Sequence, residues 1–161
     1  MDEEKRIWQA LEDVKDPELP MVSVVEMGIV REVIVEGDTA VTVKMTPTFS
    51  GCPALDVMRN DIQAKLTELG YTDTAVETIL NPPWTSDWIA DSAREKLRNL
   101  GIAPPQKHEG NVTAVAFLDV AECPRCGSKN STLKNAFGPT LCKSVWYCHD
   151  CQDAFEQFKV L

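Results

Sequence analysis

Two pairs of cysteines in the last 40 residues constrain the fold more than any other feature of the chain. Cys123-Pro124-Arg125-Cys126 and Cys148-His149-Asp150-Cys151 are C-x-x-C turns separated by 21 residues. Each turn brings two thiolates toward one ion from the same side, so two turns supply a tetrahedral four-sulfur site. The spacing predicts a zinc ribbon at 122–161 with one structural zinc ion, bound by Cys123, Cys126, Cys148 and Cys151. Rubredoxin-like iron in the same four-sulfur site is the alternative.

Runs rich in β-forming and aromatic residues at 132–137, 143–147 and 154–160 predict the short strands of this ribbon. A segment of this size has too small a core to fold alone, so the metal must supply much of its stability. A four-cysteine site leaves no open position for water or substrate, so we expect the ribbon to bind a partner and not to catalyse. Cys142 is expected to be a spare thiol on a strand. His149 is expected to face solvent, with its exchange for one cysteine ligand as the alternative.

Hydrophobic periodicity before the ribbon predicts an α/β domain, an α+β arrangement of two layers with the element order α-β-β-α-β-α. The expected helices lie at 3–15, 53–69 and 88–100, and the expected strands at 29–35, 40–46 and 74–80. The predicted division of the chain is therefore a domain at 1–103, a linker at 104–121 and the ribbon at 122–161. Within the linker, residues 111–120 are β-branched and apolar, which fits either a strand or an extended connector.

The net charge of −9 is unevenly distributed. Residues 1–121 hold 21 acidic and 11 basic side chains, a net of −10, whereas residues 122–161 carry +1. Because residues 1–121 are so acidic, they should repel phosphate backbones, which argues against nucleic-acid binding. The acidic first residues lack the apolar core of a secretory signal, and no run approaches the ~20 apolar residues of a membrane span. We therefore expect a cytoplasmic protein whose six cysteines are metal ligands or thiols and do not form disulfides.

Cys52 is the other residue with distinctive chemistry. It precedes Pro53, where a strand gives way to a helix, so it is predicted at or near the helix N-cap. Helix amides would there lower the pKa of its thiol and make it a reactive nucleophile or metal ligand, while inert packing is the alternative. An acidic loop, Asp16-Pro17-Glu18-Leu19, ends the first helix. The histidines His108 and His149 fall in the linker and the ribbon, so no base is predicted beside Cys52.

Several motifs together resemble the SufT-like domain of iron–sulfur assembly factors over residues 5–102. They are Asp16–Leu19, the run Met27–Val30, the turn ending at Cys52-Pro53, and Pro82-Pro83-Trp84. With Phe137–Lys143 and Phe155–Lys159 added, the whole chain resembles the PaaD family, accessory subunits encoded with phenylacetyl-CoA epoxidase. The resemblance implies a role in aerobic phenylacetate degradation, in which the protein supports iron–sulfur cluster assembly or maturation of the oxygenase.

The resemblance also implies a site and partners. Cys52 would be a transient cluster ligand, with Asp16, Glu18 and Thr46 nearby. The partners would be epoxidase subunits or iron–sulfur assembly proteins, and SufT-like domains tend to form homodimers. The chain has neither the Glu-x-x-His pairs of a di-iron bundle nor a Gly-rich dinucleotide fingerprint, so no catalytic residue is predicted. The alternatives are a structural subunit that docks through the ribbon, and a thiol enzyme or redox protein acting through Cys52.

Overall fold

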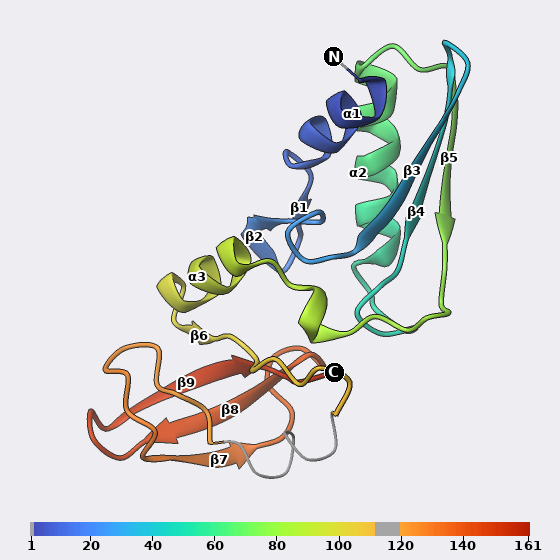
Figure 1. The fold of residues 1–161 in the computed structure, drawn as a ribbon. Helices are drawn as coiled ribbons and strands as arrows, with labels where there is room; N and C mark the ends of the chain where they lie inside the picture. The colour runs from blue at the N-terminus through green and yellow to red at the C-terminus, as the bar shows by residue number, and fades with distance from the viewer. Residues whose placement is uncertain (1, 112–119) are drawn as a thin grey trace. The chain divides into compact units, whose positions relative to one another are not determined.

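The computed structural model describes residues 2–111 and 120–161, and the chain divides into two compact units, Met1–Trp84 and Thr85–Leu161 (Figure 1). Across the described residues there are three α-helices and sheets of two, three and four strands, which confirms the predicted mixed α/β class. No helix in this part of the chain is long and apolar enough to cross a bilayer.

The first unit is built on a three-stranded sheet in the order β3-β4-β5. β3 (Val30–Glu36) and β4 (Ala40–Met45) form the predicted antiparallel hairpin, and β5 (Asp73–Thr78) runs parallel to β4. Gly37 in the hairpin turn has a φ of 70°, a left-handed conformation that glycine adopts without steric cost. The parallel pairing of β4 and β5 requires a crossover, which α2 (Leu55–Glu68) supplies.

The core of this unit lies between the sheet and two helices, α1 (Glu3–Leu11) and α2, which cover one face of the sheet (Figure 1). Val41, Val43 and Met45 of β4 are buried, while the alternating Thr42 and Lys44 are half-exposed. The period-2 prediction for this strand is therefore confirmed. Each fully buried aliphatic side chain contributes about 1.5–3 kcal/mol relative to leaving it in water.

Helix α2 ends as its sequence predicts. Gly70 follows the C-cap residue Leu69 with a φ of 99°. Its amide donates to Thr67 O at 3.0 Å, and the Tyr71 amide donates to Leu66 O at 3.2 Å. This pair of bonds is a Schellman motif, which satisfies the last carbonyls of the helix and turns the chain toward β5.

The first helix is shorter than predicted, because the chain leaves α1 at Leu11 to enter a two-stranded hairpin. β1 (Lys15–Asp16) pairs with β2 (Leu19–Ser23) across the Pro17-Glu18 turn. The hairpin is followed by a turn in which the Glu26 amide donates to Ser23 Oγ at 2.9 Å. The Ser23 amide in return donates to Glu26 Oε2 at 3.0 Å. These reciprocal bonds fix the chain as it approaches β3.

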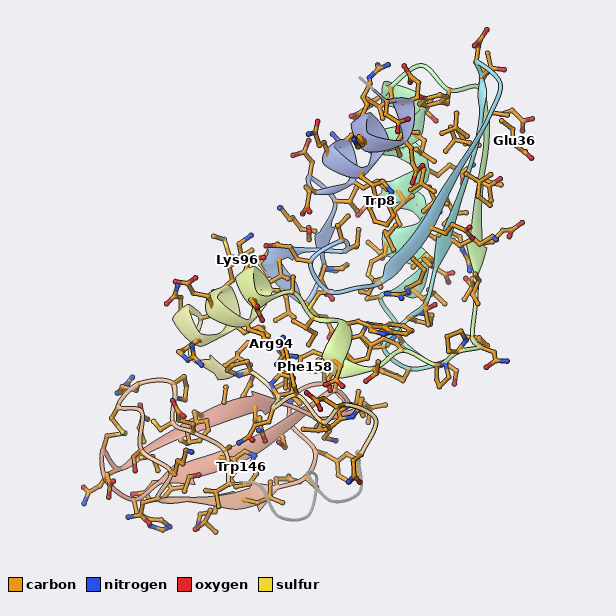
Figure 2. All side chains as sticks on the ribbon, in the orientation of Figure 1. Trp8, Glu36, Arg94, Lys96, Trp146 and Phe158 are labelled. Carbon is orange, nitrogen blue, oxygen red and sulfur yellow. The ribbon has the colours of Figure 1, made fainter. Side chains whose placement is uncertain are left out.

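The second unit holds a four-stranded sheet in the order β6-β9-β8-β7. Its elements are η1 (Ser86–Trp88), α3 (Asp91–Asn99), β6 (Ile102–Ala103), β7 (Ser131–Asn135), β8 (Lys143–Cys148) and β9 (Asp153–Phe158). The three ribbon strands were predicted, whereas β6, which pairs parallel to β9, was not. The helix predicted at 88–100 is α3, which begins at Asp91, three residues later than predicted, because the separate 3₁₀ turn η1 ends at Trp88. Trp146 packs on the buried cluster that includes Phe155, Cys123 and Cys148 (Figure 2).

The compact units differ from the predicted division of the chain, which assigned residues up to 103 to the first domain. Helix α3 packs against β6, and β6 belongs to the ribbon sheet, so both lie in the second unit. The beginning of the predicted linker is also packed, because Pro105 and His108 are buried and Arg94 Nη1 donates to Pro105 O. The strand or connector predicted at 111–120 falls almost wholly on 112–119, outside the described residues.

Candidate functional site

The four cysteines of the two C-x-x-C turns converge in the second unit. Cys123 and Cys126 lie on the turn before β7, Cys148 ends β8, and Cys151 lies between β8 and β9. In each turn the residue after the second cysteine has a positive φ, 73° for Gly127 and 58° for Gln152. This left-handed conformation turns the chain directly after the second cysteine of each pair.

The sulfur geometry fits a tetrahedral metal. All four Sγ atoms lie within 4.8 Å of one another. The distances are 3.7 Å from Cys123 to Cys151 and 3.6 Å from Cys126 to Cys148. A regular tetrahedron with metal–sulfur bonds of about 2.3 Å requires sulfur–sulfur separations of about 3.8 Å. These two distances match this value, so the four cysteines are placed to hold a tetrahedral metal ion.

Hydrogen bonds between the two turns hold this arrangement. The Asp150 carboxylate of the second turn accepts hydrogen bonds from Ser128 Oγ and, at 2.8 Å, from Asn130 Nδ2. These two bonds lower the pKa of Asp150, the one from Ser128 most. The amide of Cys151, helped by that of Asp150, lowers the pKa of Cys148 to about 7, which favours a thiolate ligand. Burial and the hydrogen bonds from Cys148, Cys123 and Cys126 raise the pKa of Cys151 to about 12, so the four thiols of the cluster do not ionise alike.

The other candidates in the ribbon lie outside the sulfur cluster. His149 Nε2 is 2.7 Å from Thr132 Oγ1, and its ring meets Tyr147 edge to face at 5.3 Å. It is exposed and is not part of the sulfur cluster, so the predicted orientation of His149 toward solvent is confirmed. Cys142 is buried, with its Sγ 3.1 Å from Thr140 Oγ1. It lies outside the sulfur cluster, as predicted, but in the turn before β8 and not on a strand, because β8 begins at Lys143.

Cys52 lies in the loop that joins β4 to α2 in the first unit. Cys52 was predicted at or near the helix N-cap, and it lies two residues before the N-cap residue Ala54, with the helix beginning at Leu55. A turn closed by the Cys52 amide on Phe49 O at 3.1 Å, followed by the Leu55 amide on Cys52 O at 3.2 Å, occupies the intervening residues. The thiol is half-buried, and the amide of Ala54 and the hydroxyl of Thr48 donate to it.

The acidic loop lies beside this thiol. Asp16, which is 7% exposed, and Glu18 are close enough for their charges to act on Cys52. Burial raises the pKa of Cys52, and the charges of Asp16 and Glu18 raise it further. The bonds from Ala54 and Thr48 act in the opposite direction and are outweighed. The predicted lowering of this pKa is therefore wrong, and Cys52 is a protonated thiol at neutral pH.

Thr46, the fourth residue predicted here, is buried at the start of the same loop, and its amide donates to Ile29 O at 2.8 Å. It lines a cavity of about 190 Å³ together with Phe49, Leu80 and Trp84. The Trp84 indole donates to Met27 O at 2.9 Å, which joins two segments of the family resemblance. The structure thus gathers Cys52, Asp16 and Glu18, and places Thr46 in a neighbouring cavity of the same loop.

Sequence inspection missed a buried polar cluster around His108. Its Nε2 lies 2.9 Å from Thr85 Oγ1 and 3.0 Å from Leu161 O, and its amide donates to Asp87 Oδ1 at 2.9 Å. Burial acts to raise the pKa of Asp87, but the amide of His108 and other donors lower it overall. The cluster anchors the segment after β6 to Leu161, three residues beyond the end of β9. A histidine in a stretch that looks like a linker carries no sequence signal of such a role.

Comparison with known proteins finds one family model for the N-terminal part of the chain and another for the C-terminal part. Residues 4–78 match a family model described as an iron–sulfur cluster assembly protein, and residues 107–159 match one described as the PaaD zinc beta ribbon domain. An Escherichia coli (strain K12) protein, provisionally named as a component of 1,2-phenylacetyl-CoA epoxidase, is 38% identical. That match covers 96% of this chain and 92% of the relative. The chain belongs to the PaaD family.

Shorter relatives match more than half of the chain, but not all of it. The Bacillus subtilis (strain 168) protein named Fe-S protein maturation auxiliary factor YitW is 36% identical, over 58% of this PaaD-family chain and 91% of the relative. A crystal structure of a domain of unknown function from Bacillus anthracis superposes with a TM-score of 0.55 at 30% identity. It covers 58% of this chain and 90% of that one. The likeness confirms the fold of the first unit, and the ribbon is the part that sets the PaaD family apart from these shorter relatives.

Proposed function

We propose that this PaaD-family protein is a cytoplasmic, non-catalytic accessory factor of phenylacetyl-CoA epoxidase, which supports iron–sulfur cluster assembly or maturation of the oxygenase in phenylacetate degradation. One observation carries the proposal: the Cys52 thiol lies where the charges of Asp16 and Glu18 act on it, in a unit related to iron–sulfur maturation factors. The E. coli relative, named as an epoxidase component, points to the recipient.

The electrostatics of this site suit a cation as cargo. Two carboxylates that disfavour a thiolate also attract a positive ion, and an iron ion that binds sulfur releases the thiol proton. Because the pKa of Cys52 is raised, its sulfur would be a protonated thiol before iron binds. It would become a thiolate ligand when iron binds and displaces the proton. Such a thiol resists adventitious oxidation and alkylation between deliveries, because the thiolate is the reactive form.

One thiolate with two nearby carboxylates is a weak set of ligands for an iron–sulfur cluster, which is normally held by several cysteines. We infer that Cys52 supplies one ligand and that the donor or recipient protein supplies the others. The cargo would then be held only during transfer. The ribbon, with its one zinc ion bound by Cys123, Cys126, Cys148 and Cys151, would serve as the docking module.

Anaerobic reconstitution with ferrous iron and sulfide tests the cluster-handling step. The wild-type protein should retain iron and sulfide through a desalting column, and Cys52→Ser should retain much less. Cys142→Ser is the matched control, because Cys142 is a thiol outside both sites. Both variants should keep one zinc per chain. Equal retention of iron and sulfide by Cys52→Ser and wild type would contradict the proposal.

A second candidate function is a purely structural subunit that docks through the ribbon and handles no cluster. The observation that favours it is the exposure of two large apolar side chains between β7 and β8, Phe137 at 62% and Leu141 at 59%. Replacement of both by serine should abolish capture of the epoxidase subunits if the ribbon docks. If epoxidase maturation survives Cys52→Ser but not this double replacement, the structural function replaces the cluster-handling one.

A further inference from the structure

A cationic groove lies in the second unit, apart from the cysteine sites. It is a cavity of about 390 Å³ lined by Arg94 and Arg98 of α3, by Lys107, and by Lys129. Glu122 is the one acidic residue of its lining, and Pro104 with Pro105 forms a stiff wall. Four positive side chains and one negative thus meet in a chain whose net charge is −9. We call this cavity the cationic groove.

Two of the four cations have no acidic partner in residues 2–111 and 120–161, since no carboxylate there pairs with Arg98 or Lys129. Lys107 Nζ lies 3.2 Å from Asp91 Oδ1, but both side chains are more than half exposed. An exposed pair of this kind is worth at most about 1 kcal/mol and opens readily for a competing anion. The groove therefore holds positive charge that an anionic ligand can use.

Arg94 is the fixed element of the groove (Figure 2). Its guanidinium donates to three backbone carbonyls, those of Ser86 at 2.7 Å, Ile89 at 3.3 Å and Pro105. Burial lowers the pKa of Arg94, and the charges of Asp91 and Asp87 act against this. Arginine stays charged at any neutral pH. The three carbonyls hold the guanidinium in one orientation but do not neutralise it. Its positive charge therefore has a fixed position at the groove.

We propose that the cationic groove binds a small molecule that carries two or more phosphate groups. Arg94 and Arg98 are four residues apart on α3, so their side chains lie on one face of the helix and can engage neighbouring phosphates. Guanidinium groups match phosphate oxygens in paired hydrogen bonds, and lysines add point charges. The cavity volume falls within the range of small-molecule sites.

The ligand is small because the rest of the chain is acidic. With the groove excluded, the net charge is more negative than −9, so a long polyanion such as a nucleic acid would be repelled beyond the groove. The lining includes no aromatic ring on which a base could stack. Recognition would therefore act on the phosphates, which a nucleoside diphosphate, coenzyme A and inorganic pyrophosphate share. This inference does not depend on the proposed cluster handling.

Isothermal titration of the zinc-loaded full chain with inorganic pyrophosphate, ADP and coenzyme A tests the proposal. All three should bind at low salt, and binding should weaken as salt is raised. The double replacement Arg98→Gln, Lys129→Gln should weaken each by at least tenfold, because two charged contacts are lost. The control Lys5→Gln, Arg6→Gln makes the same charge change at exposed positions outside the groove and should leave binding unaltered. If coenzyme A binds more tightly than ADP and pyrophosphate, the natural ligand of the groove would be coenzyme A or one of its thioesters.

Three results would overturn the proposal. The first is no heat from any of the three anions at low salt. The second is equal weakening by the groove variant and the control, which would make binding a matter of net charge alone. The third is tighter binding of a polyglutamate peptide than of pyrophosphate, which would assign the groove to an acidic protein segment.

Discussion

The backbone amide of Glu18 donates a 2.8 Å hydrogen bond to Asp16 Oδ1. This bond closes the acidic turn between β1 and β2 and fixes the Asp16 carboxylate, which is almost fully buried. The same carboxylate raises the pKa of the Cys52 thiol, in second place after burial among the effects that raise it. The state of Cys52 therefore depends on a residue 36 positions away in the sequence.

Asp16→Asn should make Cys52 more reactive. Asparagine keeps an oxygen that can accept the Glu18 amide but removes the charge, so the pKa of Cys52 should fall toward its ordinary value. Burial of the thiol and the charge of Glu18 remain in this variant, so only part of the rise in the pKa of Cys52 should be lost. The rate of alkylation by iodoacetamide near neutral pH follows the thiolate fraction and should rise. Peptide mapping by mass spectrometry gives this rate at Cys52 directly.

The pH dependence of this labelling follows from the sign of the shift. A thiol with a raised pKa ionises only at higher pH, so the wild-type rate should still be increasing above about pH 8.5, where a free thiol is half ionised. The profile of Asp16→Asn should lie at lower pH, while Asp73→Asn, an exposed residue on β5, should match wild type. A wild-type rate that levels off below pH 7 would show a lowered pKa and contradict the structure.

Removal of the ribbon metal should unfold the second unit and spare the first. Cys126→Ser leaves three sulfurs, and structural zinc contributes on the order of 10 kcal/mol or more to the folding of small zinc modules. Amide exchange should accelerate in β7, β8 and β9, and also in β6, because β6 pairs with β9. Strand β4 in the first unit should keep its protection. Elemental analysis should find one zinc per wild-type chain, and iron with a red colour would identify a rubredoxin-like site instead.

Trp84→Phe should destabilise the first unit without loss of its fold. Phenylalanine keeps much of the ring but removes the donor to Met27 O, a buried hydrogen bond of 2.9 Å. A buried carbonyl left without its donor costs about 1–3 kcal/mol in the free energy of unfolding, measurable by urea titration. Trp8→Phe is the matched control, because the Trp8 indole makes only an exposed bond of 3.4 Å to Glu4. If the two replacements lower the free energy of unfolding equally, the hydrogen bond from Trp84 to Met27 O does not contribute measurably to stability.

The parts of the fold with a strong local pattern could be predicted from the sequence. The alternation of Val41, Val43 and Met45 predicted β4, and Gly70 marked the end of α2. The two C-x-x-C turns predicted a sulfur cluster because the ligands and their spacing are themselves the signal. In these cases the local sequence and the tertiary structure favour the same conformation.

The features that escaped prediction depend on contacts between distant residues. Strand β6 has two residues and a partner more than 50 positions later, so it leaves no periodic signal. Pro53 is suited to a first helical position, but the turn that closes on Phe49 O delays the helix to Leu55. The pKa of Cys52 was expected to follow the helix dipole, yet burial and the charge of Asp16 decide its direction. The cationic groove likewise forms only when α3, Lys107 and Lys129 are brought together.

The isolated protein should not oxidise phenylacetyl-CoA, with or without NADPH. In the four-cysteine site, protein ligands would occupy all four positions around a metal ion. Such a site leaves no position at which a substrate could bind the metal. The assay is product formation by the purified, zinc-loaded chain, with the complete epoxidase complex as the positive control. Steady turnover by the single chain would contradict an accessory role.

The most direct test of the central claim is the iron and acid-labile sulfide content of the epoxidase complex purified from cells that express this protein as Cys52→Ser. The account predicts a complex with depleted iron and sulfide and low activity, while cells with Cys142→Ser yield a fully loaded one. Immunoblotting should show both variants at wild-type abundance. A fully loaded and active complex from the Cys52→Ser cells would contradict cluster handling by Cys52.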